Sequence, residues 1–389
     1  MIPRILKIQH NHNHSFFLFG PRGVGKTTLL EALLPKERTF TLDLLEYETL
    51  LRLQRRPQEF AEIIAALPDR VEWVFIDEVQ KFPPLLDEVH RQIERNPHRQ
   101  FALTGSSARK LKRGQANLLA GRAFTLALFP FTSVELGARF DLDHALQFGT
   151  LPKVHALATE DEKNMFLRSY THTYLQEEIR NEGLVRNLAG FHRFAPIAGS
   201  ENGNILSWSN FAQDTGVSMK TARGDFEILE DTLLGFFLPA YHRSLRKRQR
   251  THPKFYFFDP GVKRALAQEL TQPLIAGTPQ YGRAFEHFWI AEIMRLARYR
   301  QNDWRFSYLA THDIEIDLLV ERPGMPLLFV EIKSAETVRG QTLTPLRTLV
   351  EEIAESEGIC ISREPRARKI HPRVSIVPWQ EALTALTLQ

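Results

Sequence analysis

The feature that most constrains the fold is the stretch Ser15–Leu34, which reads SFFLFGPRGVGKTTLLEALL. An apolar run at Phe16–Phe19 leads directly into G-x-x-x-x-G-K-T at Gly20–Thr27, and a helical pattern continues until Pro35. This is the strand–loop–helix context in which the motif binds phosphate. Glycines let successive backbone amides point at phosphate oxygens, and the new helix adds free amides and the positive end of its dipole. The stretch therefore predicts a nucleoside triphosphate site, with a chance glycine-rich turn as the alternative.

The residues predicted to bind the nucleotide are the loop and the residue after it: Gly20, Pro21, Arg22, Gly23, Val24, Gly25, Lys26, Thr27 and Thr28. Lys26 is expected to reach the β- and γ-phosphates of ATP and to take part in catalysis. The Thr27 hydroxyl is placed to ligate Mg²⁺. ATP and Mg²⁺ are therefore the expected cofactors.

A second apolar run, Val71–Ile76, ends in Asp77-Glu78. Downstream of such a loop, an acidic strand end is expected to complete the nucleotide site. Asp77 would hold Mg²⁺, and Glu78 would be the catalytic base that polarises the attacking water. The alternative is an acidic strand end that caps a helix. Combined with the loop, the pair predicts hydrolysis of ATP in addition to binding.

Two further positions are candidates for contact with the γ-phosphate. Ser106 and Ser107 follow a short predicted strand at 101–103, and either could sense the phosphate in catalysis; a simple turn is the alternative. Arg122 precedes the predicted strand Ala123–Leu128 and could act as an arginine finger, in cis or in trans. A surface arginine is the alternative. A finger in trans requires neighbouring subunits, so a homo-oligomeric ring, for example a hexamer, is expected.

The first third of the chain alternates about five strands with helices, which predicts an α/β fold with a parallel sheet covered on both faces. With 389 residues, the chain can hold two or three domains. Its one cysteine, Cys360, excludes an internal disulfide framework and fits a reducing compartment. No apolar run approaches the ~18 residues that span a membrane. We therefore expect a cytoplasmic protein without a membrane partner.

Residues from about 132 to 204 are expected to be helical. On a helix predicted at Glu162–Glu182, Phe166, Tyr170 and Tyr174 have the i, i+4, i+8 spacing of a buried stripe. The next segment predicts a helix-turn-helix, with Gly216 in the turn and Ser218 as the N-cap of a second helix that extends to position 229.

This second helix carries Lys220, Thr221 and Arg223 in its first turns, where a recognition helix contacts DNA. Two predicted strands, Leu233–Tyr241 and Lys254–Asp259, flank the most basic stretch of the chain. Its cations are Arg243, Arg246, Lys247, Arg248 and Arg250. A basic hairpin loop beside a helix-turn-helix is typical of a winged helix that binds DNA phosphates. The alternative is a winged helix used only for protein contacts.

The final third carries Asp317 and, on the next predicted strand, Glu331-Ile-Lys333. In an extended chain Glu331 and Lys333 point to the same face. The D…E-x-K arrangement is that of metal-dependent nucleases: two carboxylates bind Mg²⁺ and the lysine orients water. Glu286, early in a predicted helix at Tyr281–Arg300, could add a ligand. The alternative is a charged strand pair at a sheet edge.

Several motifs together resemble a prokaryotic family of AAA-like P-loop ATPases fused to a C-terminal domain of unknown function. They are GPRGVGKTTLL, FIDEVQ, LTGSSARKL, LAGR, FYFFDPGVKRAL, EIDLLV and VEIKSA. The resemblance covers nearly the whole chain. From the sequence pattern we expect a P-loop NTPase core at 1–131 and a helical lid or linker at 132–204, and the resemblance implies that a winged helix follows at 205–270. It also implies a PD-(D/E)XK, restriction-endonuclease-like α/β domain at 271–389.

The resulting hypothesis is an Mg²⁺-dependent ATP hydrolase of the AAA class, coupled to DNA binding and to remodelling or translocation of DNA. Two alternatives remain at this point: a nucleotide-dependent switch that acts on a protein partner, and an ATP-gated DNA nuclease.

Overall fold

The computed structural model describes residues 2–8, 14–106, 119, 121–174, 188–242 and 252–387. The chain divides into two compact units. The N-terminal unit comprises Pro3–Pro130 and Ile228–Leu234, and the C-terminal unit comprises most of the rest, Phe131–Glu227 and Gly235–Gln389. Ser107, the basic stretch at 243–250 and the predicted helix beyond Tyr174 lie outside the described residues.

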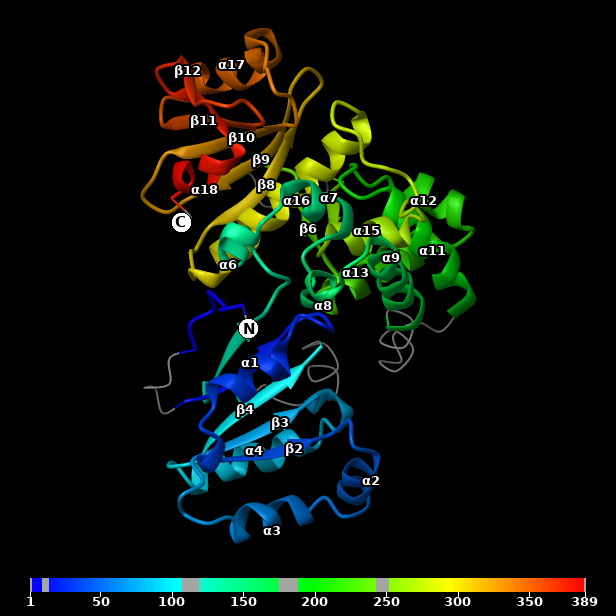
Figure 1. Cartoon of the computed structure of the whole chain (residues 1–389), viewed down its shortest axis with the longest axis vertical. Helices are drawn as coiled ribbons and strands as arrows, with labels where there is room; N and C mark the ends of the chain where they lie inside the picture. Colours follow the sequence, from blue (N-terminus) through cyan, green and yellow to red (C-terminus); the bar gives the residue numbers. More distant parts are fainter. Residues whose placement is uncertain are drawn as a thin grey trace. The chain divides into compact units, whose positions relative to one another are not determined.

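The N-terminal unit is an α/β fold whose strands and helices alternate along the chain (Figure 1). Its main elements are β1 (Ser15–Phe19), α1 (Lys26–Leu33), β2 (Thr39–Asp43), α2 (Tyr47–Arg55), α3 (Glu59–Ala66), β3 (Trp73–Asp77), α4 (Leu85–Arg95), β4 (Gln100–Gly105) and β5 (Ala123–Ala127). The five strands form a parallel sheet in the order β2-β3-β4-β1-β5. The predicted parallel sheet is confirmed.

The strand order brings the motifs of the sequence to one edge of this sheet. Strand β4 lies between β1, which leads into the glycine-rich loop Gly20–Thr27, and β3, which ends at Asp77. The carboxyl ends of parallel strands meet at the same edge, so the residue that follows β4, Ser106, lies between the loop and Asp77-Glu78. Three motifs that are far apart in sequence therefore converge there.

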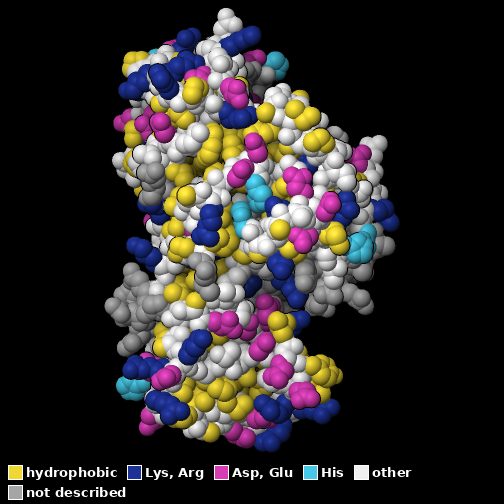
Figure 2. Space-filling model, viewed as in Figure 1, with side chains coloured by type: hydrophobic (Ala, Val, Ile, Leu, Met, Phe, Trp, Pro, Cys, Tyr) yellow, Lys and Arg dark blue, Asp and Glu magenta, His cyan; other side chains and the backbone are white. Residues whose placement is uncertain are grey.

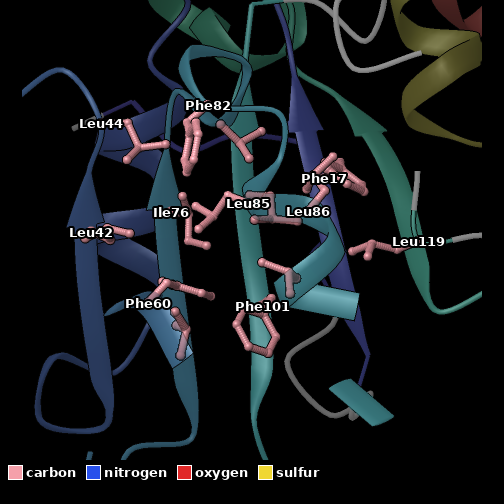
Figure 3. Close-up of a cluster of buried hydrophobic side chains, with 14 of the residues drawn as sticks. Phe17, Leu42, Leu44, Phe60, Ile76, Phe82, Leu85, Leu86, Phe101 and Leu119 are labelled. Carbon is pink, nitrogen blue, oxygen red and sulfur yellow. The ribbon is translucent and has the colours of Figure 1, made fainter. Parts of the chain in front are cut away.

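Strands β1, β3 and β4 are buried along their whole length, as expected for a parallel sheet covered on both faces. On one face, alternate strand residues such as Phe17, Ile76 and Phe101 pack with Phe60 of α3 and Leu85 of α4 (Figure 3). This apolar cluster fixes α3 and α4 against the sheet. It thereby holds the strand ends that carry the polar residues.

The C-terminal unit begins with a helical region. Its helices are α6 (Ser133–Leu136), α7 (Leu142–Phe148), α8 (Pro152–Ala156), α9 (Glu160–Ser169) and α11 (Leu188–Ser200). The helix predicted at Glu162–Glu182 begins as α9 and continues from Ser169 into a π-helical turn at Tyr170–Tyr174; the rest of the predicted helix lies outside the described residues. The predicted stripe holds for Tyr170, which is buried and whose ring lies 6.0 Å from that of Phe166.

The predicted pair of helices is present as α12 (Trp208–Thr215) and α13 (Met219–Asp231). Gly216 ends α12 with a left-handed φ of 70°, and the Ser218 hydroxyl accepts a hydrogen bond from the Thr221 amide, 3.1 Å, as an N-cap does. An antiparallel hairpin of β6 (Gly235–Leu238) and β7 (Lys254–Phe257) follows. Both strands are shorter than predicted.

The rest of this unit is a mixed sheet with strands in the order β12-β13-β11-β10-β9-β8 (Figure 1). Its elements, with the helices before and within it, are α15 (Pro260–Leu266), α16 (Pro279–Tyr299), β8 (Arg305–Ala310), β9 (Glu315–Glu321), β10 (Leu327–Lys333), α17 (Thr344–Glu352), β11 (Ser356–Ser362), β12 (Arg368–His371), β13 (Val374–Pro378) and α18 (Ala382–Ala385). The sequence pattern misses only the edge strand β12 among these strands, because the segment RKIH is short and mostly polar. None of the described helices is long and apolar enough to cross a membrane.

Candidate nucleotide-binding site

The loop between β1 and α1 has the backbone that a phosphate-binding loop needs. Gly23 and Gly25 have φ values of 79° and 93°, a region that side chains strongly disfavour. A Cβ at Gly25 would have nothing within 4 Å, so space is open beside this residue. Glycine is required at position 20 for a different reason, because a Cβ there would lie 2.3 Å from the carbonyl oxygen of Leu128. The first glycine of the motif therefore permits close packing of two backbones.

Lys26 begins α1 and is 5% exposed. Its ammonium group donates hydrogen bonds to the carbonyl oxygens of Gly20, 2.8 Å, and Pro21, 3.1 Å. The positive charge is therefore held inside the curve of the loop, next to the helix N-terminus. Both features favour an anionic phosphate at this position.

A chain of hydrogen bonds connects the loop to the acidic strand end. The Thr27 hydroxyl donates to one carboxylate oxygen of Asp77, 2.8 Å, and the Thr104 hydroxyl donates to the other. The backbone amide of Glu78 in turn donates to the Thr104 hydroxyl, 3.1 Å. The hydroxyl of Thr27 and the carboxylate of Asp77 are hard oxygen ligands of the kind that Mg²⁺ prefers, so these residues fit the predicted metal. Sequence reasoning missed Thr104.

Glu78 has a left-handed backbone, with φ 59° and ψ 47°, which is uncommon outside glycine. Such conformations concentrate at functional sites, where the surrounding structure holds them in place. The Glu78 carboxylate accepts a hydrogen bond from the side-chain amide of Gln80, and the same amide nitrogen donates to the Ser106 hydroxyl, 3.0 Å. The structure thus brings Glu78 and Ser106 together through Gln80, which the sequence had not singled out.

Arg122 lies at the opposite edge of the sheet. It precedes β5, whose first residue, Ala123, pairs with Ser15 at the start of β1. Five residues of strand separate this edge from the loop, or roughly 15 Å. The guanidinium forms an ion pair with Glu94 of α4, 2.6 Å. In this conformation Arg122 is remote from the nucleotide site of its own subunit.

A second group of ionisable residues lies in the C-terminal unit, where β7, β9, β10 and α16 meet. We call it the acidic–lysine cluster: Lys254, Glu286, Glu315, Asp317, Glu331 and Lys333. The three residues of the predicted D…E-x-K arrangement are together in it. The Lys333 ammonium lies 2.5 Å from Glu331 and 3.9 Å from Asp317, and Asp317 also accepts a hydrogen bond from the Ile332 amide, 2.8 Å.

The cluster also contains a lysine that the sequence did not suggest. Lys254 of β7 is 3% exposed, and its ammonium lies 2.8 Å from Glu315 and 3.9 Å from Glu286. The Tyr256 hydroxyl donates to Glu286, 2.6 Å. Among the residues that the structure describes, no group of three or more His, Cys, Asp or Glu side chains is arranged to hold a metal ion. Two lysines divide the carboxylates of this cluster into ion pairs.

Burial is the main reason why two of these carboxyl groups resist ionisation. Desolvation, together with the nearby Asp317, raises the pKa of Glu286 to about 7 and that of Glu331 to about 7. Burial alone would lower the pKa of the Lys333 ammonium, but Asp317 and Glu331 outweigh it and the net pKa is raised. One oxygen of Glu331, Oε2, is buried without a hydrogen-bond partner. The lysines therefore stay charged while part of the carboxylate charge is lost near neutral pH.

The residues predicted to contact DNA on α13 are at the surface. Lys220, Thr221 and Arg223 are exposed, while Ala222 and Phe226 on the other side of the helix are buried. Arg223 forms an ion pair with Glu227 one turn later, 3.0 Å. On the described part of the face drawn in Figure 2, basic and acidic side chains are interspersed. Arg243, Arg246, Lys247, Arg248 and Arg250 lie outside the described residues.

Comparison with known families divides the chain into three consecutive segments. Residues 12–137 match the AAA domain. An AAA domain therefore occupies the N-terminal unit. Residues 139–272 match a domain of unknown function (DUF8612), and residues 281–382 match another (DUF4143). The expected fusion of an AAA domain to C-terminal domains of unknown function is confirmed.

Relatives that match most of this chain include two proteins named as uncharacterized. Those of Mycobacterium bovis and Mycobacterium tuberculosis are each 27% identical over 323 residues, which cover 82% of this chain and 70% of theirs.

Among solved structures, domain III of the Thermotoga maritima replication initiation protein DnaA has 17% identity and a TM-score of 0.28, covering 57% of this chain and 86% of that one. The assembly of Thermococcus gammatolerans McrB AAA+ hexamers with bound McrC has 13% identity and a TM-score of 0.21, covering 49% and 46%. Likenesses this weak support no inference about function.

Proposed function

We propose that the protein is an Mg²⁺-dependent ATP hydrolase whose AAA domain drives binding and remodelling, or translocation, of DNA. The observation that carries the ATPase part is the hydrogen bond between Thr27, at the start of α1, and Asp77, at the end of β3. It joins the two residue types that hold Mg²⁺ in this class of site, next to a glutamate that can serve as the base.

Each residue of the site has a distinct role in this proposal. Lys26 and the loop amides bind the β- and γ-phosphates, and Thr27 and Asp77 hold Mg²⁺. When bound, Mg²⁺ neutralises the charge of the phosphate oxygens. Glu78 accepts the proton of a water whose oxygen attacks the γ-phosphorus, while the bond from that phosphorus to the bridging oxygen breaks and ADP leaves. Ser106 contacts the γ-phosphate from β4.

The DNA part of the proposal is supported by charge and position. Lys220 and Arg223 are exposed near the start of α13, a short turn after α12, and the most basic stretch of the chain follows β6. Cations in such a pair of helices and in a neighbouring loop would contact phosphates, so DNA affinity would fall steeply with salt. Loss of the γ-phosphate would alter the AAA domain and thereby move the DNA-contacting parts.

The deciding experiment measures phosphate release by the full chain, with and without single-stranded, duplex and branched DNA, and uses Lys26→Ala as the blank. We expect a rate above the blank that at least one DNA raises, and DNA binding that weakens with salt. A wild-type rate equal to that of Lys26→Ala would refute the ATPase. If no DNA stimulates the rate or binds in a salt-dependent way, the alternative of a switch for a protein partner is favoured.

The acidic–lysine cluster favours a second candidate, an ATP-gated DNA nuclease, because Asp317, Glu331 and Lys333 lie together. In that proposal Asp317 and Glu331 would hold Mg²⁺ and Lys333 would orient a water, and Glu286 lies nearby. Metal-dependent cleavage that Asp317→Ala abolishes and Glu78→Gln leaves in place would support it. Absence of cleavage with every DNA substrate would exclude it.

A further inference from the structure

We propose that Gln80 is a positioning residue for ATP hydrolysis: its side-chain amide holds the Glu78 carboxylate and ties it to the Ser106 hydroxyl. A γ-phosphate contacted by Ser106 would then set the orientation of the base. The inference rests on the proposed ATPase function. It assigns a role to a residue that lies two positions after Glu78, in a short 3₁₀ turn at Val79–Lys81.

The chemistry of the three groups fixes the direction of the contacts. An ionised carboxylate only accepts hydrogen bonds, so the amide nitrogen of Gln80, and not its oxygen, must face Glu78. The same nitrogen carries a second hydrogen, which is donated to the Ser106 hydroxyl at 3.0 Å. One side chain therefore bridges the predicted base and the predicted phosphate sensor, on two neighbouring strands.

The position of Gln80 is well defined. The side chain is 3% exposed, and its amide oxygen is buried without a hydrogen-bond partner. A Cβ on Gly105 would lie 2.8 Å from that oxygen, so the absence of a side chain at Gly105 makes room for the amide. A buried amide oxygen without a hydrogen bond is costly and calls for an explanation. The contacts of the amide nitrogen with Glu78 and Ser106 supply one.

The hydrogen bond from Gln80 also distinguishes the two carboxylate oxygens of Glu78. Gln80 donates to Oε2. In this proposal the other oxygen, Oε1, accepts the proton of the attacking water. The left-handed backbone of Glu78 fixes the start of the side chain and Gln80 fixes its end. Because a small displacement of a catalytic group can reduce a rate about 100-fold, loss of the amide should lower kcat.

The test replaces Gln80 by methionine, which is unbranched and similar in length but cannot donate. We expect kcat for ATP to fall about 10- to 100-fold while the KM and the Kd for ATP change less than about threefold. Gln92→Met is the matched control: Gln92 is 5% exposed and its amide donates to Glu88, 2.7 Å, but it lies on α4 outside the site. It should leave kcat unchanged. Thermal unfolding of both variants reports any general damage.

A second pair of variants separates positioning from structure. If Gln80 acts only through Glu78, then adding Gln80→Met to Glu78→Ala should not lower the residual rate further, since residues that act as a unit are not additive. Likewise, Ser106→Ala should cost less in the Gln80→Met background than in the wild type. Independent, multiplicative losses would overturn the proposal, as would an unchanged kcat for Gln80→Met in an active enzyme. A wild-type rate no higher than that of Lys26→Ala would instead refute the ATPase, and the role of Gln80 with it.

Discussion

Replacing Asp225 by asparagine should stabilise the protein at neutral pH and not at acidic pH. Asp225 is 8% exposed on α13, beside Phe226, which is completely buried. Burial raises the pKa of the Asp225 carboxyl to about 6. At pH 7 the folded protein must therefore carry a carboxylate that would be better hydrated in the unfolded chain. Asparagine has the same shape and never bears that charge.

The size of the effect follows from the two pKa values. An aspartate has an ordinary pKa of 3.8, and a folded value of about 6 favours the protonated form in the folded state. This stabilisation is complete below about pH 4 and is lost as the pH rises through about 6. The difference of about two pKa units corresponds to about 3 kcal/mol. Because the carboxylate keeps part of its hydration, we take about half of this free energy. We therefore expect Asp225→Asn to raise the free energy of unfolding by about 1–2 kcal/mol at pH 7.

Urea unfolding of the full chain at pH 7 and pH 4.5 measures this directly. The gain of Asp225→Asn over the wild type should be larger at pH 7 than at pH 4.5 by about 1 kcal/mol. Asp214→Asn, an exposed aspartate before the turn at Gly216, is the control and should change stability by less than about 0.5 kcal/mol. An equal gain at both pH values, or none at pH 7, would refute the reasoning.

Three other variants test particular contacts. Gly20→Ala should destabilise the AAA domain by about 1–3 kcal/mol and weaken ATP binding, since its Cβ would lie 2.3 Å from the Leu128 carbonyl oxygen; calorimetry would detect both changes. Arg122→Ala and Lys26→Ala should each lack ATPase activity, and mixing them should restore part of it; an inactive mixture would argue against a finger in trans. Lys254→Met should lower the free energy of unfolding by about 1–3 kcal/mol. It should also make the melting temperature rise more on addition of Mg²⁺ than in the wild type, and an equal rise in both proteins would contradict this.

The strands and polar strand ends of the candidate nucleotide site could be predicted from the sequence because their signals are local. The apolar runs that end in Gly20 and in Asp77 identify two strands and their polar ends without knowledge of the rest of the fold. A parallel sheet then brings those ends to one edge. What the sequence could not give is the contact between side chains on neighbouring strands. Gln80 and Thr104 lie within the motifs FIDEVQ and LTGSSARKL, but their contacts with residues of the neighbouring strand follow from the strand order.

The acidic–lysine cluster was predictable only in part, for the same physical reason. Asp317, Glu331 and Lys333 lie on adjacent strands with side chains on one face, which an alternating pattern indicates. Lys254 comes from the hairpin β6–β7, more than sixty residues earlier, and its pairing with Glu315 depends on how that hairpin packs. Local sequence carries no signal for such a contact. The cluster therefore has a second lysine, Lys254, where the pattern predicted only Lys333.

The place of Arg122 constrains how ATP hydrolysis could require assembly. Arg122 lies at the edge of the sheet formed by the amino-terminal ends of the strands. The loop lies at the opposite edge, roughly 15 Å away along the strands, so Arg122 cannot contact the nucleotide of its own subunit in this conformation. Its ion pair with Glu94 joins side chains that are 40% and 52% exposed, and breaking such a pair costs only about 0–1 kcal/mol. For Arg122 to reach the nucleotide site of another subunit, the amino-terminal edge of one sheet must face the carboxyl-terminal edge of the next, which is a head-to-tail contact between copies. Repetition of that contact closes a ring when the rotation between neighbouring subunits allows it. If the mixed-variant experiment restores activity, the amino edge of β5 is therefore one side of the subunit interface.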